Sequence, residues 1–197
     1  MLEYKVPDLG KDPLKFVLED LDFKHDGIWL EFGVFSGSTI NYISKFTDNV
    51  VYGFDSFRGL PEDWRQNHLK GEFDMGGTLP IVNNNVVLIE GLFQDTLEKF
   101  LKKTDKKISF VHIDCDLYSS TKYVLDTISK YMADECIIVF DEIFNFNEYD
   151  GAASELRALQ EFILENEVKT EWIGMNGVPY GMHGRPHQNA AVRLIMK

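Results

Sequence analysis

The chain has 197 residues, of which 44% are apolar and 26% charged. Such a composition is that of an ordinary globular domain, and a domain of this length buries roughly 70% of its unfolded surface. Acidic residues outnumber basic ones by 32 to 20, so the formal net charge is −12. Because nucleic-acid binding depends on Lys and Arg side chains that neutralise phosphates, this charge argues against a nucleic-acid partner and favours a neutral or sugar-like ligand.

The sequence carries no pattern typical of a membrane protein or an exported one. No apolar run approaches the roughly 20 residues that a membrane-spanning helix needs. The N-terminal stretch MLEYKVPDLGKDP has neither the apolar core nor the small-residue cleavage site of a signal peptide. We therefore expect a cytoplasmic protein in which Cys115 and Cys136, both in apolar strand-like runs, stay reduced.

Short apolar runs alternate with helical patterns along the chain. In chain order, the predicted elements are a helix over 12–21, a strand over 27–34, a helix beginning within 35–46, strands over 49–56 and 85–91, a helix over 93–103, a strand over 108–114, a helix over 119–131 with Ser and Thr available as caps, a strand over 135–142, a helix over 153–166, and strands over 169–175 and 189–196. This alternation predicts an α/β fold with a mostly parallel sheet covered by helices on both faces. No linker or repeat divides the chain, so residues 1–197 are predicted to form one domain.

One stretch does not fit the alternation. Residues 58–85 are long for a connection between two strands, contain GLPEDW and DMGGTLP, and show no clear period. Long loops in compact domains are commonly lids or binding loops, so we expect an active-site lid here. Trp64 in this loop is expected to line the pocket, together with Phe57 and Phe93, which closely follow predicted strands.

Acidic side chains stand at the ends of four predicted strands. They are Glu31, Asp55, Asp114, Asp116, Asp141 and Glu142. Sheets of this kind bind ligands at the carboxyl ends of their strands, near the point where the strand order reverses. We therefore expect these acids to line a single crevice.

The turn after the first strand, in LEFGVFSGST, contains Gly33 and Gly37 but matches no phosphate-binding motif. It lacks the Gly-Lys-Ser/Thr of a P-loop and the third glycine of the dinucleotide fingerprint. Asp55 ends the second strand about twenty residues later, where an acid bonds ribose hydroxyls in folds of this type. Because Glu31 repels phosphate, the pattern favours a ligand with ribose, adenine and a positive centre, which describes S-adenosylmethionine.

Several longer blocks resemble a known family. LEFGVFSGST, YGFDSFRGLPEDW, VVLIEGLFQDTL, FVHIDCDLYSSTKYVLD and IIVFDEIFN follow the order and spacing of the macrocin O-methyltransferases, from about Leu30 to Phe162. The resemblance implies a Rossmann-like class I methyltransferase with a seven-stranded sheet whose last strand is antiparallel. It also implies that S-adenosylmethionine and Mg²⁺ are the cofactors and that a sugar hydroxyl is the acceptor.

The resemblance assigns metal ligation to Asp114, Asp141 and Glu142, although this family usually has a second Asp at the position of Glu142. The predicted catalytic residues are Asp114 and Asp116. The residues predicted to bind S-adenosylmethionine are Glu31, Gly33, Phe35, Ser36, Gly37, Ser38, Thr39, Asp55, Ser56, Gly91, Phe93 and Asp114.

Carboxylates at neighbouring strand ends form the oxygen-only site that Mg²⁺ prefers, and vicinal hydroxyls of a diol or catechol can complete it. The general base stays open among Asp116, His183 and His187, the two histidines lying in a loop before the last strand. His112 alternates with Asp114 on its strand and is predicted to be a hydrogen-bonded core residue.

Two other functions remain open from the sequence. The same fold could serve a NAD(P)-dependent reductase, which the missing third glycine disfavours, or a non-catalytic cofactor-binding module. The expected partners are a small hydroxylated acceptor and a second copy of the chain in a possible homodimer, with no nucleic acid and no membrane.

Overall fold

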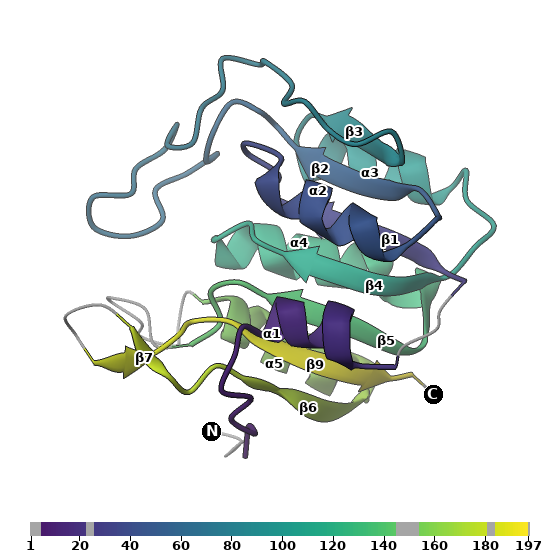
Figure 1. Ribbon diagram of the computed structural model, residues 1–197. Coiled ribbons are helices and arrows are strands. Elements are labelled where there is room, and N and C mark those ends of the chain that lie inside the picture. The colour runs from purple at the N-terminus through teal and green to yellow at the C-terminus, as the bar shows by residue number, and fades with distance from the viewer. Residues whose placement is uncertain (1–4, 23–25, 145–153, 181–183, 197) are drawn as a thin grey trace.

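The computed structural model describes residues 5–22, 26–144, 154–180 and 184–196, and its centre is a seven-stranded sheet (Figure 1). The strands of this sheet are β1 (Ile28–Phe32), β2 (Val51–Asp55), β3 (Val86–Glu90), β4 (Ile108–Ile113), β5 (Met132–Phe140), β6 (Lys169–Met175) and β9 (Ala190–Ile195). The α-helices are α1 (Pro13–Lys15), α2 (Ser38–Ile43), α3 (Phe93–Leu101), α4 (Tyr118–Ile128) and α5 (Glu155–Asn166). Short helical turns cover Phe16–Asp20, Ser44–Phe46 and Ser129–Tyr131, and β7 (Pro179–Tyr180) and β8 (Arg185–Pro186) form a small separate ribbon.

The strand order is β3-β2-β1-β4-β5-β9-β6. The first five strands in this order are parallel to one another, and β9 is antiparallel to both β5 and β6. This topology is that of the class I methyltransferase fold, so the predicted fold and the antiparallel last strand are confirmed. The order reverses between β1 and β4, which places the expected ligand crevice at the carboxyl ends of these strands.

Apolar side chains alternate between two cores, one on each face of the sheet. Leu30 and Phe32 point into the core under α3, α4 and α5, whereas Trp29, which precedes them, belongs to the core under α1 and α2. Figure 1 shows α1 and α2 in front of the sheet and α4 and α5 behind it. Burial of both faces explains why the strands are almost continuously apolar.

Backbone pairing continues just beyond the strand ends and draws the polar residues there together. The N–H groups of Gly33, Asp114 and Asp141 donate to Phe54, Phe32 and Ile113, respectively, at 2.9–3.0 Å. The turns after β1, β4 and β5 therefore leave the sheet side by side.

Helix boundaries differ slightly from the predictions. The helix expected over 119–131 begins at Tyr118, and within the described chain no side chain caps it, so the expected Ser/Thr cap is not formed. The helix expected over 153–166 begins at Glu155, and the Ser154 side chain caps it by accepting from the Arg157 N–H. None of the helices in the described segments has the length and apolarity required to cross a bilayer.

Candidate functional site

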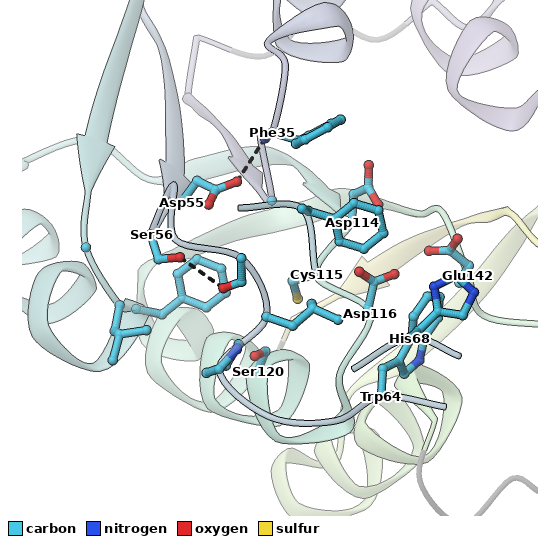
Figure 2. Close-up of a pocket in the computed structure, with 18 of the residues that line it drawn as sticks. Phe35, Asp55, Ser56, Trp64, His68, Asp114, Cys115, Asp116, Ser120 and Glu142 are labelled. Carbon is cyan, nitrogen blue, oxygen red and sulfur yellow. Dashed lines mark hydrogen bonds between the residues drawn. The ribbon is translucent and has the colours of Figure 1, made fainter. Parts of the chain in front are cut away.

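A cavity of about 290 Å³ opens at the carboxyl ends of β1, β2 and β4. Its lining includes seven of the residues predicted to bind the cofactor, which are Gly33, Phe35, Asp55, Ser56, Gly91, Phe93 and Asp114. Figure 2 shows Asp55 and Ser56 on one side of this cavity and Asp116 and Glu142 on the other. The cavity therefore brings the glycine turn and the strand-end acids together, as the sequence predicted.

The turn after β1 is held in shape by Asp55. One carboxylate oxygen of Asp55 accepts hydrogen bonds from the N–H groups of Val34 and Phe35, each at 2.8 Å, and the other accepts from Phe57 N–H at 2.7 Å (Figure 2). Gly33 has φ +86°, and a Cβ atom there would lie 1.8 Å from the Asp114 carbonyl oxygen. Only glycine allows the turn to approach β4 this closely.

A second cavity of about 330 Å³ lies on the face of the sheet that α1 and α2 cover. Ser38 and Thr39, at the start of α2, line this cavity with His112 and Asp141. Of the other predicted cofactor residues in the turn, neither Ser36 nor Gly37 is among the described residues that line either cavity. The predicted cofactor residues are thus distributed over two cavities.

Glu31 and His112, on the neighbouring strands β1 and β4, form a fully buried pair. Glu31 Oε1 lies 3.0 Å from His112 Nδ1, while Glu31 Oε2 has no hydrogen-bond partner among the described residues. Burial raises the pKa of Glu31. Burial alone would lower the pKa of His112, but the hydrogen bond and charge of Glu31 with the charges of Asp114 and Asp141 raise it to about 9. Its burial and its hydrogen bond to Glu31 confirm His112 as a hydrogen-bonded core residue. Glu31 lines neither cavity in the described chain.

Three carboxylates meet in the first cavity and could hold a cation. The group consists of Asp114, Asp116 and Glu142, whose oxygens lie within 4.8 Å of one another. Burial and neighbouring charges raise the pKa values of Asp114 and Glu142 well above their ordinary values. Burial also raises the pKa of Asp116 to about 6, against the opposing effects of its hydrogen bond to Glu142 and the positive charge of Arg65.

This carboxylate group fits a hard divalent cation. Its donors are all oxygens, the ligands that Mg²⁺ prefers, and the described part of the chain offers no hydrogen-bond partner to Glu142 Oε2. Close, buried carboxylates repel one another, and a divalent ion relieves that repulsion. Asp116 adopts φ +63°, an uncommon conformation for a residue with a side chain, and its carboxylate faces Glu142 (Figure 2).

The expected trio of metal ligands is not brought together as predicted. Asp141 lines the second cavity, and Asp116 takes its place beside Asp114 and Glu142. Both residues lie in the bend that follows β5, and there the neighbouring side chains of Asp141 and Glu142 line different cavities.

The long loop after β2 contributes cavity residues that the sequence did not single out. Trp64 lines the cavity as predicted, and so do Arg65, His68 and Phe73. Phe93 also lines it, but the prediction for Phe57 was wrong, because its side chain is fully buried in the core under α1 and α2. The loop has no period in its sequence, so nothing marked which of its side chains turn inward.

The loop over 58–85 has two parts that are held differently. Residues up to 78 fold back on themselves, with bridges from Arg58 to Asp74 and from Arg65 to His68. The end of the loop is fastened to α2, where Asn41 and Asn83 each donate to backbone carbonyl groups at 2.9–3.0 Å. The lid that the sequence predicts therefore corresponds to the first part, and its movement remains a prediction.

Of the two histidines considered as bases, only His187 belongs to the residues that the structure describes. His187 donates its backbone N–H to Asn176 and is not among the described residues that line either cavity. His183 lies outside the described residues.

Comparison with known proteins agrees with the fold. A strand order of this kind, with a glycine turn and strand-end acids at its reversal point, defines the class I methyltransferases. The family model described as methyltransferase domain matches residues 30–143, more than half of the chain, so the protein belongs to this methyltransferase family. No match is found among curated protein sequences.

Solved structures with the same fold include several methyltransferases. CalS11, a calicheamicin methyltransferase, superposes with a TM-score of 0.59 at 22% identity, covering 91% of this chain and 74% of CalS11. NovP, an O-methyltransferase, gives 0.58 at 16% identity over 93% of this chain and 76% of NovP. An O-methyltransferase from Bacillus cereus, in complex with SAH, gives 0.55 at 14% identity over 86% of this chain and 74% of that one. At these identities the likeness establishes the fold.

Proposed function

We propose that the protein is an S-adenosylmethionine-dependent O-methyltransferase of the macrocin type, which uses Mg²⁺ and methylates a hydroxyl group of a small, sugar-like molecule. The observation that carries the proposal is the cavity in which the glycine turn, Asp55 and the carboxylate group of Asp114, Asp116 and Glu142 face one another. A methyltransferase needs a cofactor site and an acceptor site that share one space, and this cavity offers both.

The two cavities suit two different parts of the cofactor. Its adenosine part suits the first cavity, where Asp55 lies at the end of β2 and Gly91 and Phe93 follow β3. Its amino-acid part suits the second cavity, because Lys15, Ser38 and Thr39 can meet a carboxylate, while Asp12 and Asp141 can meet an ammonium group. The Bacillus cereus relative, whose structure is a complex with SAH, supports this choice of cofactor.

The metal would be held by Asp114, Asp116 and Glu142, with Asp141 as the alternative that the family resemblance implies. When bound, a Mg²⁺ ion supplies Lewis acidity that favours loss of the acceptor's hydroxyl proton. The protein's own residues do the remaining work, which is alignment of the acceptor oxygen with the methyl carbon and sulfur of the cofactor. Trp64, Phe73 and Phe93 exclude water around these atoms.

The acceptor is expected to be small and hydroxylated. A related structure of CalS11 is described as a TDP-rhamnose 3′-O-methyltransferase, at 23% identity and a TM-score of 0.56. Arg65 brings positive charge to an otherwise acidic cavity, which suits a sugar that carries an anionic group. The cytoplasmic location and the homodimer remain predictions.

One experiment separates the proposal from its alternatives. Calorimetric titrations with S-adenosylmethionine and with NADH are followed by a methylation assay on sugar nucleotides and catechols with Mg²⁺. The proposal requires binding of S-adenosylmethionine and transfer of its methyl group to an acceptor. Preferential binding of NADH would support a reductase, and binding without transfer to any acceptor would support a non-catalytic module.

A further inference from the structure

We propose that His68 is the general base of this site and that Glu72 is the residue that positions it. The inference rests on the proposed methyl transfer and adds the group that accepts the hydroxyl proton. It starts from an ion pair in the lid: His68 Nδ1 lies 3.2 Å from Glu72 Oε1, and both side chains are about one-third exposed, at 33% and 34%.

The backbone holds both members of this pair in place. The N–H of His68 donates to Arg65 O at 2.8 Å, and the N–H of Trp64 donates to His68 O at 3.0 Å. Glu72 O accepts from Leu60 N–H at 2.9 Å. The rings of Trp64 and His68 lie 5.2 Å apart, so the imidazole also packs against an aromatic neighbour.

The pair fixes which nitrogen of His68 can accept a proton. An ionised carboxylate only accepts hydrogen bonds, so Glu72 favours the tautomer with the proton on Nδ1 and leaves a lone pair on Nε2. The ring of His68 lines the first cavity, and Figure 2 shows it beside Glu142 and Asp116. The charged groups around it are Glu72, these two carboxylates and Arg65.

The other candidate bases are committed elsewhere. His112 is hydrogen-bonded to Glu31, is buried and lines the second cavity. Asp116 belongs to the carboxylate group that would hold the cation. Among the residues that the structure describes, His68 is the histidine that lines the first cavity.

The proposed step transfers a methyl group to the acceptor oxygen and a proton to His68. The acceptor O–H bond breaks and its proton passes to His68 Nε2, while the oxygen forms a bond to the methyl carbon. The carbon–sulfur bond breaks, its electron pair returns to sulfur, and the positive charge of the sulfonium is lost as the imidazolium forms. Glu72 stabilises that imidazolium by its opposite charge.

The first test compares variants in a methyl-transfer assay with TDP-rhamnose and catechol as acceptors. His68→Asn keeps a hydrogen-bond donor toward Glu72 but cannot act as a base, so kcat should fall by about 100-fold or more. The dissociation constant for S-adenosylmethionine should stay within about twofold, and added imidazole should restore part of the rate. Lys70→Gln, an exposed change in the same loop, is the matched control and should behave like the unchanged protein.

A His68→Asn protein with a kcat close to that of the unchanged protein would show that His68 is not the general base, and would leave the proposed methyltransferase function intact. If the unchanged protein methylates neither acceptor although it binds the cofactor, the proposed function is contradicted for both. In that case a second measurement tests the His68–Glu72 pair by itself. Two-bond ¹⁵N–¹H correlation spectra should show the His68 proton on Nδ1, and Glu72→Gln should weaken that preference; a proton on Nε2 would overturn the inference.

Discussion

Replacement of Asp55 should lower both the stability of the fold and the affinity for the cofactor. Asp55 accepts three backbone hydrogen bonds, two of them part-buried, from Val34 and Phe57, and one exposed, from Phe35. A hydrogen bond to a charged group contributes about 1.5–3 kcal/mol, and water can replace only the exposed one. At the low end of that range, Asp55→Ala should reduce the free energy of unfolding by about 3 kcal/mol.

Asp55→Asn should remove only part of this stabilisation. Its amide oxygen can still face Val34 and Phe35, but its amide nitrogen then faces the N–H of Phe57, so the loss should be about half, near 1.5 kcal/mol. Glu90 ends the neighbouring strand, pairs with Asp55 in the register and is exposed, so Glu90→Gln is the matched control and should change stability by no more than about 0.5 kcal/mol.

The assays are urea unfolding and calorimetric titration with S-adenosylhomocysteine. If Asp55 also bonds the ribose, Asp55→Ala should weaken binding by about 1–3 kcal/mol, or roughly five- to 150-fold. Lower stability with unchanged affinity would refute the ribose contact and leave Asp55 only the role of holding the turn. Values for Asp55→Ala that match those for Glu90→Gln in both assays would refute the whole reasoning.

Three further predictions concern the metal, the buried acids and the lid. With Mn²⁺ as a probe for Mg²⁺, Asp116→Asn and Glu142→Gln should each weaken metal binding by about tenfold or more. Asp141→Asn should have a smaller effect, and the reverse order would favour the set of ligands that includes Asp141. Burial raises the pKa of Glu155 well above its ordinary value of 4.5. The stability that the protonated Glu155 side chain contributes is therefore fully present at pH values below 4.5 and is lost as the pH rises through the folded-state pKa. In EDTA, Glu155→Gln should therefore match the unchanged protein near pH 4 and be more stable at pH 8, by on the order of 1 kcal/mol or more; equal pH dependence in urea titrations would contradict this. Proteolysis within residues 58–79 should slow when S-adenosylmethionine and acceptor are bound, and identical cleavage rates would count against a closing lid.

The sequence was sufficient for the sheet, because period-two patterns and buried apolar runs depend on local residue types. Leu30, Trp29 and Phe32 show this, since each points to the core that its place in the alternation predicts. The same logic identified Gly33 and Asp55, whose roles follow from their place at the ends of β1 and β2.

The grouping of the acids was harder to predict. The sequence places Asp141 and Glu142 together, but in the bend after β5 they line different cavities, and Asp116, with a φ of +63°, joins Asp114 and Glu142 in the group. His68 and Glu72 were missed for another reason. They belong to a loop without a period, and they meet only because Leu60, Arg65 and Leu69 fix its backbone.

The central claim is that methyl transfer takes place in the first cavity and depends on its carboxylate group. The most direct test measures S-adenosylhomocysteine formed from S-adenosylmethionine and a methylatable acceptor, with EDTA and then with Mg²⁺ restored, for the unchanged protein and for Asp114→Asn. Product should disappear in EDTA and return with Mg²⁺, and Asp114→Asn should form none while still binding the cofactor. Full turnover in EDTA, or by Asp114→Asn with added Mg²⁺, would show that these carboxylates serve the fold and not the reaction.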